Sequence, residues 1–340
     1  MIMEKKTAGG LMSREAVSAL KGVSIICIVL HNVVHLLSEV KECEFSFSEA
    51  PVQTFMESFL RIPVESVISF YGWVVVSVFM FASGYGLTVK YGDRPIMATR
   101  WIWEHYKKLF LLLLPVMTGM IVGRLILYGL SDGERLTNML LQQSLLLNII
   151  NPKAISPGVY WYLGLAFQFY LCFLLFRKIP VKGLVAIAVL SWGLTAFLPH
   201  DGVNYVRHNC MGWMPEFVLG IILARKEIKI ERAGKAMLLI SGLVLTVACS
   251  VSGYTFSLSG IGFIAVLLSI KDYLTRSRAL LFIGSISATL YVVHPMVRSV
   301  YLFWMTAQLE ANPVLSGIIV LVMSVPVAIL YKRLWMSKVG

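Results

Sequence analysis

Charged residues are scarce in this sequence. Of its 340 residues, 14% are Asp, Glu, Lys or Arg, 58% are apolar, and the mean hydropathy is +0.77. Soluble domains carry about 25% charged residues, so the composition excludes a soluble globular protein and indicates a membrane protein. The net charge of +12 would suit a nucleic-acid partner, but the basic residues lie in short loops between apolar runs. That pattern is typical of membrane topology, and no nucleic-acid partner is expected.

Metal and redox motifs are also missing. The five cysteines include no CxxC pair, so no metal site is expected. Cys43 and Cys210 fall in loops that we place outside the membrane, where a disulfide between them is one option. No internal repeat, low-complexity tract or long linker is present, and the first apolar run is not followed by a small-residue cleavage site. We therefore expect a single integral-membrane domain over residues 1–340.

The apolar runs predict an all-α polytopic membrane protein. A helix needs about 20 apolar residues to cross the hydrocarbon core. About ten transmembrane helices are expected, at residues 17–37, 66–89, 108–130, 159–177, 181–199, 211–225, 235–251, 254–270, 279–306 and 313–331. Residues 137–150 are apolar but too short and too polar to cross, so an interfacial or re-entrant helix is expected there.

The basic residues predict the orientation of these helices. With the N-terminus inside, 23 of the 30 Lys and Arg residues fall in inside segments and five fall in outside loops. This positive-inside bias predicts cytoplasmic N- and C-termini. The first outside loop is acidic instead and contains Glu39, Glu42, Glu44, Glu49, Glu57 and Glu65.

Several ionisable side chains lie inside the predicted spans. Arg124, Glu216 and Arg298 are examples, and such groups are functional candidates because they are costly at membrane depth. The alternative is structural: Glu216 pairs with one of the arginines and ties helices together.

Three histidines also lie at membrane depth. His31 lies ten residues after Lys21, which places it about 15 Å deeper along the helix, near the midplane. His35 follows on the same helix face, since residues four apart share a face. His294 lies in another span, with Arg298 one turn later. A lone histidine in an apolar run is more often a hydrogen-bonding group than a catalyst, but here two separate helices carry one at similar depth.

Four stretches carry a resemblance to a known family. They are "LKGVSIICIVLH" (20–31), "VFMFASGYGL" (78–87), "YWYLGLAFQFYL" (160–171) and "GSISATLYVVH" (284–294). With these four stretches in this order, the chain resembles the membrane-bound acyltransferase 3 family, whose members O-acylate cell-surface glycans. It departs from the family pattern at two points. Lys21 replaces the commoner Arg, and Asn32 occupies the usual position of the first-helix histidine, one residue after His31. A periplasmic esterase-like domain, which some members of the family carry fused to this unit, is not expected here.

The resemblance implies an enzyme of the bacterial inner membrane with no bound cofactor. It would transfer an acyl group from cytoplasmic acyl-CoA to a hydroxyl of a cell-surface or lipid-linked carbohydrate, and acetyl is the first candidate for that group. His31 would act as the base or be transiently acylated, and a histidine is the usual base near neutral pH. The thioester oxygen needs a donor in the transition state, for which Lys21, Tyr85 or a protonated partner of His294 are candidates.

The resemblance also implies binding residues, each with a plainer alternative. The acyl-CoA is expected at Ser83, Gly84, Tyr85, Arg100, Lys107 and Lys108. The carbohydrate is expected at Trp161, Tyr162, Gln168, Tyr170, Glu216, His294 and Arg298. The alternatives are ordinary positive-inside residues, small residues that pack helices, and an interfacial aromatic belt.

Two other classes of protein fit the composition. Ten helices with buried His, Arg and Glu would suit a proton-coupled transporter of a small polar solute, but the sequence shows no inverted repeat and no paired broken helices. A non-catalytic assembly subunit is the third interpretation. A CoA thioester transfer assay separates these two from an acyltransferase.

Overall fold

The computed structural model describes residues 11–43, 45–128, 160–226, 228, 230–305 and 312–339, together with positions 133, 137, 141 and 144–146. All regular structure in these residues is helical, and no strand occurs in them. The all-α prediction is therefore confirmed. The predicted interfacial segment at 137–150 lies mostly outside the described residues.

The predicted apolar runs coincide with helices. They are α1 (Arg14–Leu37), α3 (Pro63–Tyr71) with η1 (Gly72–Val75) and α4 (Val76–Tyr91), α5 (Ala98–Tyr128), α7 (Trp161–Phe176), α8 (Val181–Phe197), η5 (Cys210–Trp213) with α10 (Met214–Ala224), α11 (Arg232–Ser250), η6 (Phe256–Leu258) with α12 (Ser259–Leu274), α13 (Arg278–Ser285) with α14 (Ser287–Met305), and α15 (Pro313–Tyr331). The remaining helices are α2 (Glu49–Ser58), α9 (His200–Arg207), η7 (Lys332–Met336) and α16 (Ser337–Val339).

Fewer of these helices than expected have the length of a full span. In the described part of the chain, six helical segments are long and apolar enough to cross a membrane, or seven if α13 and α14, bent by 76° at their junction, form one span. The helices α7, α8 and η5–α10 are apolar but shorter. The ten apolar helices are thus present, whereas ten complete crossings are not confirmed.

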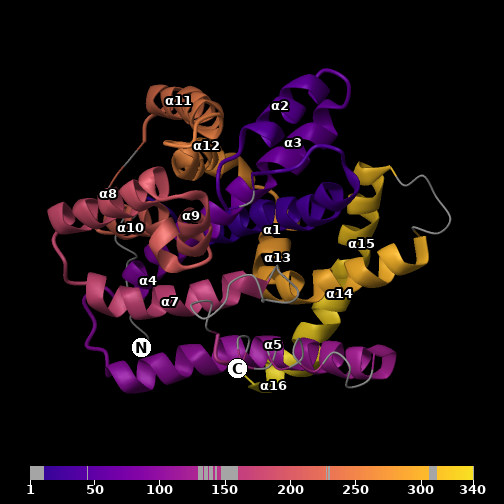
Figure 1. Cartoon of the computed structure of the whole chain (residues 1–340). Helices are drawn as coiled ribbons and strands as arrows, with labels where there is room; N and C mark the ends of the chain where they lie inside the picture. Colours follow the sequence, from indigo (N-terminus) through magenta and orange to yellow (C-terminus); the bar gives the residue numbers. More distant parts are fainter. Residues whose placement is uncertain are drawn as a thin grey trace.

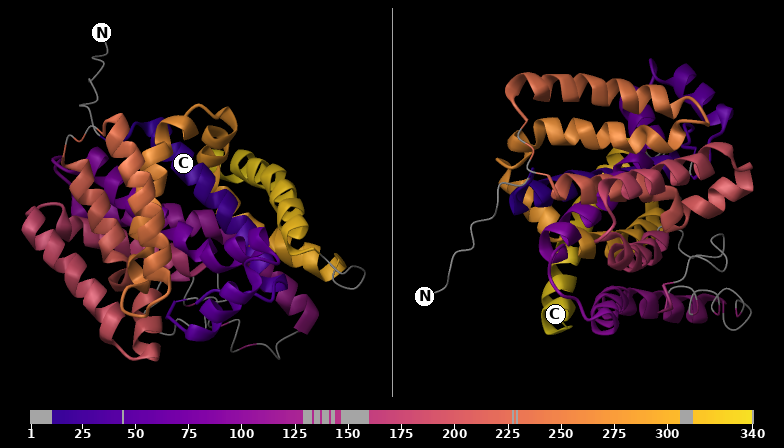
Figure 2. Two further views of the ribbon diagram at one scale, coloured as in Figure 1. Left: turned by 90° about the horizontal axis from the view of Figure 1, so that it is seen from above. Right: turned by 90° about the vertical axis from the view of Figure 1, so that its left-hand side faces the viewer.

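Helix α1 occupies the centre of the molecule. It begins after Ser13, whose side chain accepts a hydrogen bond from the Ala16 N–H at 3.1 Å and so caps the helix. It packs against α3, α4, α12, α13, α14 and α15, and Figures 1 and 2 show it between the α11–α12 pair on one side and α7 and α5 on the other. About half of the apolar window of α1 (56%) and 67% of that in Pro63–Tyr91 is buried, against 22% in α11. The two helices with the first family motifs are therefore interior, and α11 is peripheral.

Helix α4 crosses α10 at backbone contact. A Cβ atom on Gly84 would lie 2.1 Å from the Phe217 carbonyl oxygen, and one on Gly220 would lie 2.2 Å from the Phe81 carbonyl oxygen. Neither position can accept a side chain without moving a backbone apart. Gly84, expected at the acyl-CoA site, therefore packs two helices together in this structure.

The cysteines do not pair as the sequence allowed. All five are free thiols, and the Cys43 thiol donates to the Ser48 carbonyl oxygen at 3.4 Å. Cys210 lies beside Cys172 instead, with 3.7 Å between the sulfur atoms. The Cys43–Cys210 disulfide is therefore absent.

Candidate active site

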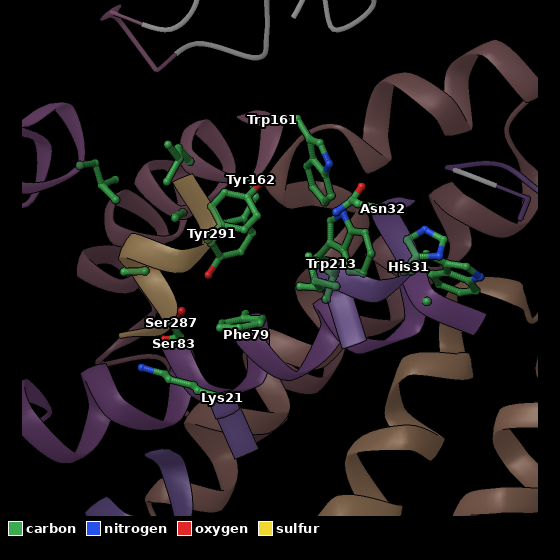
Figure 3. Close-up of a pocket in the computed structure, with 18 of the residues that line it drawn as sticks. Lys21, His31, Asn32, Phe79, Ser83, Trp161, Tyr162, Trp213, Ser287 and Tyr291 are labelled. Carbon is green, nitrogen blue, oxygen red and sulfur yellow. The ribbon is translucent and has the colours of Figure 1, made fainter. Parts of the chain in front are cut away.

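A cavity of about 260 Å³ lies between α1, η1, α4, α5, α7, η5 and α14 (Figure 3). Lys21 and His31 both line it. His31 lies ten positions after Lys21 on α1, which corresponds to about 15 Å along the helix axis. The cavity is therefore elongated and follows α1.

The two ends of the cavity differ in chemistry. Figure 3 shows Lys21, Ser83 and Ser287 together at one end, which we call the Lys21 end. Phe79, Tyr162 and Tyr291 lie between the ends. The other end, called the His31 end, is lined by His31, Asn32, Glu42, Phe45, Trp73, Trp161 and Trp213.

His31 is buried and held from both sides of its ring. Its Nδ1 lies 3.0 Å from the Ile68 carbonyl oxygen. Because a carbonyl oxygen only accepts hydrogen bonds, Nδ1 carries a proton and donates it. Its Nε2 faces Glu42 Oε2 at 3.1 Å. Nε2 is thus the ring nitrogen that can exchange a proton or bind a ligand.

The His31 ring also lies directly on the backbone of η1. A Cβ atom on Gly72 would stand 2.0 Å from His31 Cγ and 2.1 Å from Nδ1. Only glycine leaves room for the imidazole at this position. Gly72 therefore helps to fix where His31 lies.

Glu42 lies in the loop after α1 and is largely buried. Burial alone would raise the pKa of its carboxyl group, but the neighbouring His31 and, more weakly, His35 and Arg207 outweigh burial and hold that pKa below its ordinary value. Glu42 is therefore a carboxylate that compensates positive charge on His31 whenever the imidazole is protonated. Glu42 is one of six acidic residues in its predicted loop, and no local pattern distinguishes it from the others.

Arg207, at the end of α9, is fully buried behind the His31 end. Its guanidinium group lies 4.1 Å from the ring centroid of Trp213 and 5.2 Å from that of Trp73. Burial lowers the pKa of Arg207 to about 10, although the charges of Glu216 and Glu42 oppose this. Arg207 therefore supports two tryptophans of the cavity wall through cation–π contacts.

Glu216 has a different cationic neighbour from the one expected. Its Oε1 accepts a hydrogen bond from the Ser77 hydroxyl at 3.3 Å, and Arg207 is the cation that acts on it. Arg298 donates instead to the Asn32 carbonyl oxygen at 3.1 Å. Of the two arginines considered as partners of Glu216, Arg298 therefore does not pair with it, and Glu216 does not line the cavity.

His294 and Arg298 act on the cavity through Asn32. His294 Nδ1 donates to the Leu290 carbonyl oxygen at 3.2 Å, so its Nε2 is the atom that accepts from the Asn32 amide at 3.3 Å. Asn32 lines the cavity, whereas His294 and Arg298 do not. Together they hold Asn32 beside His31.

Of the residues expected to bind acyl-CoA on α4, only some line the cavity. Ser83 lines the cavity, but Gly84 and Tyr85 do not. The Tyr85 hydroxyl accepts from the Met12 N–H at 2.9 Å and donates to the Met12 carbonyl oxygen at 3.3 Å. Both hydrogen bonds of the Tyr85 hydroxyl thus fix the backbone at Met12. This does not support Tyr85 as a donor to the thioester oxygen.

The three basic residues expected at acyl-CoA lie on the surface of α5. Arg100, Lys107 and Lys108 are exposed, and Arg100 pairs with Glu104 at 2.9 Å. They do not line the cavity. Any contact with CoA would therefore be made outside it.

Helix α7 supplies aromatic side chains to the cavity. Trp161, Tyr162 and Tyr170, which were predicted to bind the carbohydrate, line it. Gln168 instead donates to Asn209 Oδ1 at 2.8 Å and accepts from the Cys210 N–H at 2.8 Å. Gln168 therefore ties α7 to η5 and does not face the cavity.

One family of known proteins matches nearly the whole helical part of the chain. Residues 14–333, from α1 into η7, match the family described as "Acyltransferase domain", acyltransferase 3. No curated protein and no solved structure matches the chain significantly. Because the match spans nearly the whole sequence, the chain belongs to the acyltransferase 3 family of membrane acyltransferases, as its resemblance predicted.

Proposed function

We propose that this protein transfers an acyl group from acyl-CoA to a hydroxyl group of a cell-surface or lipid-linked carbohydrate, with acetyl as the first candidate for the acyl group. The observation that carries the proposal is the elongated cavity, which has a primary amine at one end and a His–Glu pair at the other. Two substrates could enter such a cavity from opposite ends and meet inside it. Membership of an acyltransferase family favours this reaction over solute transport.

The donor is assigned to the Lys21 end. The positive-inside bias of the sequence predicts that Lys21 lies near the cytoplasm, where acyl-CoA is made. The pantetheine arm of CoA is a long chain that can extend through the cavity towards His31. Since Lys21 and His31 stand about 15 Å apart along α1, they cannot both contact one thioester carbonyl. Lys21 is therefore better suited to bind the anionic or carbonyl groups of CoA than to stabilise the reacting oxygen.

The chemistry is assigned to the His31 end. The acceptor hydroxyl gives its proton to His31 Nε2, and its oxygen forms a bond to the thioester carbonyl carbon. The carbon–sulfur bond then breaks, and the leaving thiolate takes the proton from the imidazolium. Glu42 stabilises the imidazolium while it holds that proton, and the Ile68 carbonyl and Gly72 keep the ring in place.

The acceptor is assigned to the aromatic wall around His31. Trp161 and Trp213 stack on each other with centroids 5.8 Å apart and present flat apolar surfaces on which a sugar ring can stack. Trp73 Nε1 is a buried N–H donor without a hydrogen-bond partner in the described residues. It and the Asn32 amide are the candidates for donors to the oxyanion.

The proposal is tested with the full-length protein in membranes and in cells. Membranes with the protein should release CoA from acetyl-CoA in an acceptor-dependent way, and His31→Ala should abolish this at unchanged protein level. Mass spectrometry of surface glycans should show a missing acetyl group in a deletion strain, restored by the original gene and not by His31→Ala. A fully restored acetyl group with His31→Ala would remove the base from the mechanism. Solute uptake without CoA release would favour the transporter.

A further inference from the structure

Three metal-ligating side chains meet at the His31 end of the cavity. His31 and His35 lie four residues apart on one face of α1, and their ring centroids are 5.2 Å apart. Glu42 comes from the following loop. One ligand atom from each of the three side chains lies within 4.8 Å of the other two. The sequence contains no CxxC metal motif, and the spacing of His31 and His35 at i and i+4 on one helix face is the signal in it that points to a metal site.

We propose that His31, His35 and Glu42 form a binding site for a divalent transition-metal ion, with Zn²⁺ as the first candidate, and that metal bound there inhibits acyl transfer. The site itself follows from the side-chain geometry. The inhibition rests on the proposed function, because it requires that His31 Nε2 accepts the proton of the acceptor hydroxyl.

The ligand set suits zinc. Two imidazoles and one carboxylate are a common three-residue set for this ion and leave one position open. The Nδ1–H of His31 is fixed on the Ile68 carbonyl oxygen at 3.0 Å. Metal-binding histidines usually donate their second ring N–H to a carbonyl or carboxylate in this way, which orients the other nitrogen towards the ion. Here that nitrogen is Nε2.

The spacing requires only a small adjustment. Ligands held at about 2.1 Å from a tetrahedral ion are about 3.4 Å apart. His31 Nε2 and Glu42 Oε2 are 3.1 Å apart, yet Oε2 has no aligned hydrogen bond among the described residues. The Nδ1 of His35 is likewise buried without a hydrogen-bond partner there. A rotation of the His35 side chain that moves its ring nitrogen by about 1–2 Å would bring that nitrogen to the distance that zinc requires.

The surrounding charges select the kind of ion. Lys41 and Arg298 act on His35, and Arg207 acts on Glu42. These cations weaken a site that depends on charge alone, as sites for Mg²⁺ and Ca²⁺ do. They weaken less a site whose ligands are imidazole nitrogens, which prefer Zn²⁺, Cu²⁺ and Ni²⁺.

Inhibition follows from the atom that the metal would occupy. A metal bound to His31 Nε2 takes the lone pair that must accept the hydroxyl proton. It also holds Glu42, which is needed to stabilise the imidazolium. Transfer should therefore fall as the site fills, and it should recover when a chelator removes the ion.

Binding is measured first, on purified full-length protein in detergent with Zn²⁺ alone. Equilibrium dialysis with metal analysis should give one Zn²⁺ per chain, and Co²⁺ should give the visible absorption of a tetrahedral site. His35→Asn, and independently His35→Gln, should weaken binding at least about tenfold, since a ligand is lost. His200→Asn is the control, because His200 is an exposed histidine of α9 outside the cluster. Equal zinc affinity in the original protein and both His35 variants would overturn the site.

Transfer is measured next, as CoA release at increasing Zn²⁺. The original protein should be inhibited, and His35→Asn should keep its transfer activity while the inhibitory Zn²⁺ concentration rises at least about tenfold. The same inhibition in both proteins, or loss of transfer when a chelator is added, would overturn the inhibitory role. The two proposals fail separately: a protein that binds Zn²⁺ but transfers no acyl group refutes only the enzyme, and one that transfers but binds no Zn²⁺ refutes only the metal site.

Discussion

The two ends of the cavity solve the problem of buried charge in different ways. At the His31 end the protein compensates its own charges: His31 faces Glu42, and Arg207 is stacked on aromatic rings near Glu42 and Glu216. At the Lys21 end, one amine stands with the hydroxyl side chains Ser83 and Ser287. No ion pair with Lys21 occurs among the residues that the structure describes. A charge without a protein partner is available for a ligand of opposite charge.

Under the proposed function, this difference separates the chemistry at the His31 end from donor binding at the Lys21 end. Groups that must act on a reacting atom need fixed positions, and misplacement by about 1 Å can cost about 100-fold in rate. The His31 ring has this support from Ile68, Gly72 and Glu42. Lys21 ends a flexible side chain, which suits recognition of an anion as a point charge. The variants below test this division of roles.

The largest effect concerns which side each end faces. In a cysteine-free variant, Glu57→Cys on the exposed face of α2 should react completely with an impermeant thiol reagent added to intact cells. Lys107→Cys on α5 should react only after the membrane is opened. The native Cys43 is a poor probe because it is buried. The reverse labelling pattern would place the donor and the acceptor at the opposite ends.

The next effect concerns the charge partner of His31. Glu42→Gln keeps the shape of the side chain but removes the carboxylate that stabilises the imidazolium, so kcat should fall about 100-fold or more. Glu39→Gln is the matched control, because Glu39 lies in the same loop but is exposed and paired with Arg61. Equal rates for the two variants would show that the buried pair has no part in the chemistry.

Placement of the ring is tested at Gly72. In Gly72→Ala the new methyl group would overlap the imidazole, and the displaced His31 should lower kcat about 100-fold. Gly86→Ala is the matched control, since a Cβ atom there meets no atom within 4 Å. Thermal unfolding in detergent should show that both variants are folded, with Gly72→Ala the less stable because overpacking of a buried site costs about 1–3 kcal/mol. A Gly72→Ala enzyme with unchanged kcat would mean that the position of His31 is not decisive.

The two ends should differ in which KM they control. Lys21→Ala removes a charged hydrogen-bond donor, worth about 1.5–3 kcal/mol, and should raise the KM for acyl-CoA at least about tenfold. Trp161→Ala should raise the KM for the acceptor about three- to tenfold, since an aromatic contact is worth about 0.5–1.5 kcal/mol. Lys21→Arg should remain close to the original enzyme. An effect of both alanine variants on the same KM would contradict two separate ends.

The smallest effect is expected at the surface of α5. Exchange of Arg100, Lys107 and Lys108 for Gln should raise the KM for acyl-CoA about two- to threefold, because exposed charges contribute about 0–1 kcal/mol. The effect should vanish at high salt. Arg61→Gln, which removes an exposed charge elsewhere, should leave this KM unchanged. An increase larger than that of Lys21→Ala would move the main donor contact out of the cavity.

Patterns of consecutive residues were enough to predict the helices and several of the residues that line the cavity. Apolar runs located every long helix of the described residues, because the period and length of such runs are properties of consecutive residues. The ten-residue distance from Lys21 to His31 already fixed the length of the cavity along α1. The motif around Trp161 and Tyr162 identified two further residues that line it.

Long-range contacts decided the rest of the site. Nothing in the sequence distinguishes Glu42 from five other glutamates of the same loop, and only the packing of that loop onto α1 brings it to His31. Gly84 belongs to a family motif, yet the crossing of α4 and α10 makes it a packing residue. Tyr85, Gln168 and Glu216 are polar groups in apolar helices, but their hydrogen bonds point away from the cavity.

The sequence by itself thus determined an all-helical membrane protein, its family, and the helix that carries Lys21 and His31, because hydropathy and motif order are written along the chain. The tertiary structure decided which polar groups share one cavity and which only join helices. In an apolar environment every buried polar group needs a partner, and the partner comes from another helix whose position no local pattern contains.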